Sequence, residues 1–184
     1  MIIEIRAKNC FVFEDDIVFS MKADMRNKKF ASNVHRENNF NVLKTVGVYG
    51  PNNVGKTCLV KCIRAIKHVL LDKKSGLVPN IFSDNEVCQL GVTFLAYGRK
   101  FSYDFWYNAK TNEYVYESFS EMLKDHYGNE KEVNWLKRDT INDVYYCTDE
   151  DVQAMMAIIS KNNLFCYLVD ISKFECLKEM KDIL

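Results

Sequence analysis

The stretch Gly50-Pro51-Asn52-Asn53-Val54-Gly55-Lys56-Thr57 has two glycines separated by four residues, followed by a lysine and a hydroxyl side chain. It fits the phosphate-binding loop pattern at every fixed position. Glycine tolerates unusual backbone angles, so such a loop can surround phosphates with backbone N–H donors that continue into Cys58. Lys56 would place its ammonium on the β- and γ-phosphate oxygens, and the Thr57 hydroxyl would ligate Mg²⁺. The stretch therefore predicts a nucleotide site running from Gly50 to Cys58.

The residues on either side of the loop supply the context that the pattern requires. Val42 to Tyr49 is rich in β-formers and predicts a buried strand leading into the loop. Cys58 to Leu71 has apolar residues at helical spacing and predicts a helix leaving it. The helix would direct the partial positive charge of its N-terminus at the phosphates.

The remaining segments predict a mixed architecture around this loop. Residues 2–8 and 16–21 are typical of strands, and residues 22–41 of a polar connecting loop. Residues 87–119 predict an antiparallel β-meander, and residues 120–184 a mainly helical part with helices over 149–161 and 172–184. We therefore predict an α/β fold with a mixed sheet: one phosphate-loop lobe over residues 1–184, whose first part, residues 1–71, holds the strands, the loop and its helix.

Composition indicates the size, net charge and cellular compartment of this lobe. The chain has 184 residues, enough for one domain, and its 25 basic and 25 acidic residues cancel. Seven cysteines without paired C-x-x-C spacing are typical of reduced thiols in a cytoplasmic protein. No apolar run approaches the roughly 20 residues that a membrane helix needs, so no membrane partner is expected.

Three stretches together resemble a known family. Lys8-Asn9 and Phe13 precede the loop, and Gly98-Arg99-Lys100-Phe101-Ser102-Tyr103-Asp104-Phe105 lies in the meander after it. Residues 1–120 are similar in this arrangement to the first lobe of ABC-type ATPases of the RecF/SMC class. The similarity extends to small bacterial ATPases of the AAA class that are linked to phage defence and abortive infection, relatives of the OLD-type nucleases.

The resemblance implies ATP and Mg²⁺ held between two ATPase heads, with Asn52 and Asn53 near the phosphates. It also implies a signature motif, a Walker B strand and a switch histidine in a second lobe, and this sequence departs from the pattern there. The weak candidates are Asp170, after the apolar run 164–169, as a Walker B metal ligand, and the less regular run 144–150. Gln89 is a weak candidate for a metal or water contact. The first strands of such proteins approach the base or ribose, which would involve Arg6, Lys8 and Asn9.

These observations leave several functions open. The first is an ATPase whose hydrolysis needs a missing lobe, supplied by self-association or by a partner protein carrying the Walker B and signature motifs. The second is a non-hydrolysing, ATP-dependent interaction module that controls an effector nuclease or toxin. A small GTPase or nucleotide kinase is a minor alternative, based on the D-x-x-G match at Asp125 to Gly128. The meander aromatics favour packing over base stacking, and direct nucleic-acid binding stays an open alternative.

Overall fold

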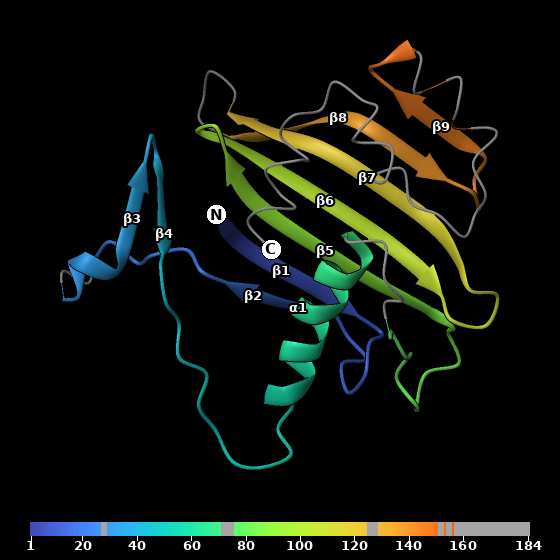
Figure 1. Cartoon of the computed structure of the whole chain (residues 1–184), viewed down its shortest axis with the longest axis horizontal. Coiled ribbons are helices and arrows are strands. Elements are labelled where there is room, and N and C mark those ends of the chain that lie inside the picture. Colours follow the sequence, from blue (N-terminus) through green and yellow to red (C-terminus); the bar gives the residue numbers. More distant parts are fainter. Residues whose placement is uncertain (27–28, 71–75, 125–128, 151–152, 154–155, 157–184) are drawn as a thin grey trace.

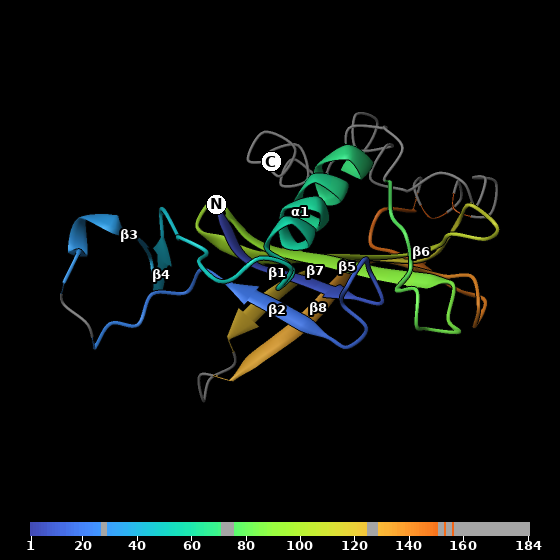
Figure 2. The same ribbon diagram turned by 90° about the horizontal axis from the view of Figure 1, so that it is seen from below.

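A seven-stranded antiparallel sheet with helix α1 against one face is the main body of the protein (Figures 1 and 2). The computed structural model describes residues 1–26, 29–70, 76–124, 129–150, 153 and 156. The elements of this body are β1 (Ile2–Lys8), β2 (Ile17–Ser20), α1 (Lys56–Leu70), β5 (Val87–Ala96), β6 (Arg99–Asn108), β7 (Glu113–Lys124), β8 (Glu130–Asp139) and β9 (Val144–Cys147). A short 3₁₀ helix, η1 (Ala31–Asn33), precedes a separate two-stranded sheet of β3 (Val34–Glu37) and β4 (Phe40–Leu43).

The sheet runs in the order β2-β1-β5-β6-β7-β8-β9, and each neighbouring pair is antiparallel. From β5 onward the strands follow one another as hairpins. The turn between β5 and β6 consists of Tyr97 and Gly98, with φ angles of 51° and 70°. Positive φ at both positions is what a type I′ turn requires, and this turn matches the twist of the two strands it joins. In contrast, β1 reaches β5 only after the chain has passed through the phosphate loop and α1.

Alternation along the strands decides which face α1 covers. Phe101, Tyr103 and Phe105 belong to the same buried cluster as the apolar side of α1, together with Cys62, Ala65, Ile66, Val69, Cys88, Leu90, Val92 and Phe94. The intervening side chains face the other way. There, Arg6 donates to Thr93 Oγ1 at 2.5 Å and pairs with the Asp104 carboxylate at 2.9 Å. One face of the sheet is thus the core, and the other holds polar pairs, as is common in antiparallel sheets.

Several predicted elements are confirmed. Strands at residues 2–8 and 16–21 correspond to β1 and β2, and the helix after the loop is α1. The meander predicted over residues 87–119 is present as β5, β6 and β7. Glu150, Gln153 and Met156 are helical, within the helix predicted from residue 149. The predicted helix at residues 172–184 lies outside the described residues.

The predicted α/β fold with a mixed sheet and C-terminal helices is wrong. The described sheet is antiparallel throughout, and residues 120–124, 130–139 and 144–147 are strands, where a helical part was predicted. The reason is that strand pairing continues through this region. β7 runs to Lys124 and pairs with β8, which in turn pairs with β9. Backbone groups paired in this way have no need of helical hydrogen bonds.

The strand predicted at Val42 to Tyr49 is also not formed as expected. Only its first two residues belong to a strand, β4, and that strand pairs with β3 rather than with the main sheet. From Lys44 to Gly55 the chain is outside any strand, and Val48 and Tyr49 are 47% and 92% exposed. Residues 22–41, predicted as a polar connecting loop, contain η1, β3 and the start of β4. The buried parallel strand that would have defined an α/β fold is therefore missing from the described residues.

Candidate functional site

The predicted phosphate loop lies at the start of α1, which begins at Lys56 (Figure 1). Asn53 and Gly55 have positive φ angles, 64° and 91°, which turn the chain sharply before the helix. A Cβ on Gly55 would lie 3.3 Å from both Val12 and Phe13, so the loop also approaches the β1–β2 connection closely. Both the conformation and the close approach favour glycine at this position.

The first N–H groups of α1 are available to a ligand. The first hydrogen bond of the helix is donated by the Leu59 N–H to the Gly55 carbonyl, at 2.9 Å. Among the described residues, the N–H groups from Gly55 to Cys58 have no backbone acceptor. Unpaired donors at a helix N-terminus, together with the helix dipole, form a site for anions. Neither an Asp nor a Glu occupies the first turn.

Lys56 lies folded over its own loop. Its ammonium donates to the Gly50 carbonyl at 2.7 Å and to the Pro51 carbonyl. These bonds close the loop into a ring. The same ammonium would reach a phosphate by exchanging carbonyl oxygens for phosphate oxygens. Thr57 is exposed beside it, so its hydroxyl is open to a hydrated cation.

The other candidate residues that the structure describes do not lie at this loop. Gln89 lies on β5 next to Cys88 and Leu90, whose side chains face α1, so the pleat directs Gln89 to the opposite face. The second weak Walker B stretch forms the edge strand β9. Asp170 and the D-x-x-G match at residues 125–128 lie outside the described residues.

The three residues expected near a base or ribose have structural contacts. Arg6 pairs with Asp104 on the polar face, and Lys8 pairs with Asp16 at 2.8 Å. Asn9 is buried, and its amide donates to the Val87 carbonyl at 3.1 Å, with a further bond to the Asn85 carbonyl. Asn9 therefore fastens the end of β1 to the segment that leads into β5.

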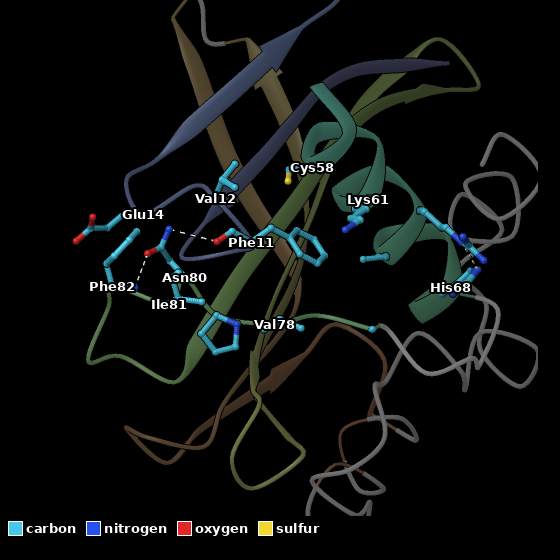
Figure 3. A pocket seen from close by; sticks show the side chains of 14 residues that line it. Phe11, Val12, Glu14, Cys58, Lys61, His68, Val78, Asn80, Ile81 and Phe82 are labelled. Carbon is cyan, nitrogen blue, oxygen red and sulfur yellow. Dashed lines mark hydrogen bonds between the residues drawn. The ribbon is translucent and has the colours of Figure 1, made fainter. Parts of the chain in front are cut away.

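A groove that the sequence did not reveal runs along α1 from Cys58 (Figure 3). Its volume is about 840 Å³. The connection after β1 and the segment before β5 form one wall, and α1 forms the other. The first wall contributes Phe11, Val12 and Phe82, and α1 contributes Lys61, Arg64 and His68. The spacing of the three α1 residues could have indicated a common helix face, but nothing in the sequence shows which loops lie opposite.

Cysteines around the base of α1 are buried thiols. Cys62 is inaccessible, and burial raises its pKa to about 12, with the nearby Cys58 and Cys88 adding to the shift. Cys10 lies next to Cys88, and the hydrogen bond between the two thiols, with burial, raises the pKa of Cys10 as well. A thiol with a raised pKa stays protonated at neutral pH, so these groups act as small apolar side chains. The described cysteines Cys10, Cys58, Cys62, Cys88 and Cys147 form no disulfide with one another.

Comparison with known proteins adds no family to this description. No protein-family model matches the chain, and no curated protein matches it. Within the described part of the chain, no helix combines the length and apolar character needed to cross a bilayer. The function therefore has to be argued from the site itself.

Proposed function

We propose that the chain binds ATP–Mg²⁺ through the loop from Gly50 to Thr57 and does not hydrolyse it unaided. The observation that carries this proposal is the junction of that loop with α1. There, the N–H groups from Gly55 to Cys58 have no backbone acceptor among the described residues, and the ammonium of Lys56 lies over the loop. Backbone donors and a cation thus occur together at one helix N-terminus, and a triphosphate supplies the matching acceptors.

Each loop residue has a defined part in this proposal. Gly55 permits the turn directly before α1, and Asn53 makes the preceding turn. Lys56 would move from the Gly50 carbonyl to the β- and γ-phosphates and neutralise part of their charge. Thr57 would ligate Mg²⁺ that bridges the same phosphates.

Hydrolysis requires one more function, a group that orients the attacking water. The chain offers Asp170 as the nearest candidate for a second metal ligand, and Ile171 follows it where an ATPase of the resembled class would have its general base. We therefore assign hydrolysis to an assembly in which a second copy or a partner protein completes the site. A role in phage defence or DNA maintenance follows from the resemblance, and a cytoplasmic location from the cysteine spacing; both remain predictions.

A second candidate function is an ATP-controlled interaction module for an effector such as a nuclease or toxin. The exposed segment that enters the loop favours it, because Val48 and Tyr49 lie in water immediately before Gly50. Ordering of the loop around a triphosphate would restrain these side chains and change what they present to a partner. This module would need ATP binding and no turnover.

Calorimetric titration of the purified chain with ATP in the presence of Mg²⁺ tests the proposal. We expect saturable binding, weakened at least about tenfold by Lys56→Ala, since charge-assisted contacts to phosphate are lost. Lys67→Gln is the matched control: it removes a cation from an exposed position of the same helix, away from the loop. Removal of Mg²⁺ by chelation should weaken binding in the wild type.

Two results would contradict parts of the proposal. Absence of ATP uptake by the folded wild-type chain would remove the binding site. Steady phosphate release by the isolated chain, lost in Lys56→Ala, would show that the chain completes catalysis alone. A preference for GTP in the same titration would support the GTPase alternative instead.

A further inference from the structure

The geometry points to a second ligand site in the groove along α1, which takes an amphipathic organic anion: an apolar ring or chain with a carboxylate, sulfate or sulfonate head. This inference does not depend on ATP binding. Three properties of the groove carry it: size, apolar anchoring surface and excess of positive charge.

The groove has the dimensions of a small-molecule site. Its volume of about 840 Å³ lies within the range of roughly 300–1,000 Å³ typical of such sites. The two segments that form the wall opposite α1 are held to each other by hydrogen bonds. Phe11 donates its N–H to the Val78 carbonyl at 2.9 Å, and Asn80 donates its amide to the Phe11 carbonyl at 3.2 Å. The Phe82 N–H is bonded to the Asn80 side chain at 2.9 Å.

The apolar part of the groove comes from the two loops opposite α1 (Figure 3). Val12, Val78, Ile81 and Phe82 are all more than half exposed, with Phe82 at 82%. Phe11 is partly buried and packs against the core below. Exposed apolar side chains gathered around one concavity are characteristic of binding surfaces rather than of ordinary protein surface. The amide of Asn80 already serves the backbone, so the groove offers little for recognising a polar ligand body.

The charged part comes from α1. Lys61 and Arg64 are one helical turn apart on the groove side, and neither has a carboxylate partner among the described residues. Lys61 lies over the Phe11 ring, 5.6 Å from its centroid, and Arg64 donates from Nε to His68 Nε2 at 3.3 Å. Among the described residues that line the groove, Glu14 is the one carboxylate, against the two permanent cations Lys61 and Arg64. An anionic head group beside the apolar wall would neutralise this excess through charge-assisted hydrogen bonds to Lys61 and Arg64.

The groove adjoins the predicted phosphate loop at Cys58, but its two cations lie further along α1. Lys61 lies five residues beyond Lys56, about 7.5 Å along the helix axis, and its ammonium is on the Phe11 side. A ligand in the groove therefore needs neither Lys56 nor Thr57.

The test uses the fluorescent probe 1-anilinonaphthalene-8-sulfonate, which combines an aromatic body with a sulfonate head. We expect saturable binding with a blue-shifted emission. The double variant Lys61→Gln/Arg64→Gln should weaken it about tenfold, the scale of losing one charge-assisted contact. Lys67→Gln, on the same helix but outside the groove, should change it less than twofold. Phe82→Ser should also weaken binding. Because Phe82 is 82% exposed, this variant should keep the fold, which circular dichroism checks.

Competition defines the chemical class. Decanesulfonate should displace the probe, whereas decanol should do so at least about tenfold less well, because it lacks the head-group charge. Binding of the probe should persist in Lys56→Ala, which separates this site from the proposed ATP site. The proposal is overturned by equal competition from decanol, by an unchanged affinity in the double variant, or by loss of probe binding in Lys56→Ala. Light scattering showing a dimer that excludes the probe would identify a second copy as the occupant and would likewise overturn it.

Discussion

Strands β5 and β6 and the segment between Leu43 and Gly50 both contain many β-forming residues, yet only the first region is a paired and buried part of the sheet. Both are rich in β-branched and aromatic residues. β5 pairs on one side with β1 and on the other with β6, and Phe94 and Phe101 are fully buried. The segment before the loop has no strand beside it in the described part of the chain, and Tyr49 is 92% exposed. The comparison shows that β-propensity expresses itself only where neighbouring strands and a core are present.

The largest expected effect comes from exchanging one aromatic residue in each region. Phe101→Ala removes a ring that stacks on Phe94 and Phe119 and contacts Trp135 edge-on, at centroid distances of 5.4–5.7 Å. It should lower the free energy of unfolding by about 3–5 kcal/mol. Tyr49→Ala should change it by less than about 0.5 kcal/mol, because an exposed side chain contributes little packing. Urea denaturation followed by far-ultraviolet circular dichroism measures both.

Equal destabilisation of the two variants would contradict the conclusion that only the first region is packed. A large effect of Tyr49→Ala would mean that the segment before the loop is packed in solution, against another copy or another part of the chain. Repeating the measurement over a range of protein concentrations distinguishes these two cases, since only self-association depends on concentration.

An effect of intermediate size, on ATP affinity, is expected at Gly55, where the exposed segment meets α1. Gly55→Ala introduces a Cβ at φ 91° and at 3.3 Å from Val12 and Phe13. Alanine at such an angle costs about 1–3 kcal/mol, and the loop can relieve this by changing its shape. We therefore expect weaker ATP binding with little loss of stability, measured by calorimetry and denaturation of the same sample. Gly76→Ala, at φ 63° with open space around it, is the control that carries strain without touching the loop.

The smallest effect on stability is expected on the polar face of the sheet. Lys100, whose side chain is 4% exposed, donates to the Glu130 carboxylate at 2.6 Å, and this hydrogen bond lowers the pKa of Glu130 despite the opposing effect of burial. A carboxyl group with a lowered pKa stabilises the folded state above its unfolded pKa, and this contribution is lost as the pH falls through the folded pKa. Wild type should exceed Glu130→Gln in stability at pH 7 by no more than about 1 kcal/mol, since Glu130 is partly exposed. The difference should shrink below about pH 4.5.

Denaturation of both proteins between pH 3 and pH 7 measures this dependence. A difference that stays constant with pH would show that the substitution acts through shape rather than charge. Glu132→Gln, a neighbouring exposed carboxylate on β8, serves as the reference for a general change in net charge.

The sequence by itself determined the elements whose signals are local. Apolar spacing specified α1, alternation specified β1, and Tyr97-Gly98 specified a tight hairpin between β5 and β6. The phosphate-loop pattern likewise fixed which residues stand at the start of α1. The sequence did not predict β8, because the run from Glu130 to Asp139 is mostly charged and has little apolar alternation.

Only the tertiary structure decided the remaining features, because they depend on residues far apart in the chain. β8 is a strand since the edge of β7 offers it hydrogen bonds, and β1 pairs with β5 across the whole loop–helix insertion. The segment after Leu43 stays out of the sheet for lack of a neighbour. The groove exists because two loops lie opposite one face of α1, and no local sequence pattern predicts this arrangement. Local patterns thus set the backbone conformation, while long-range pairing set the fold class and the shape of the surface.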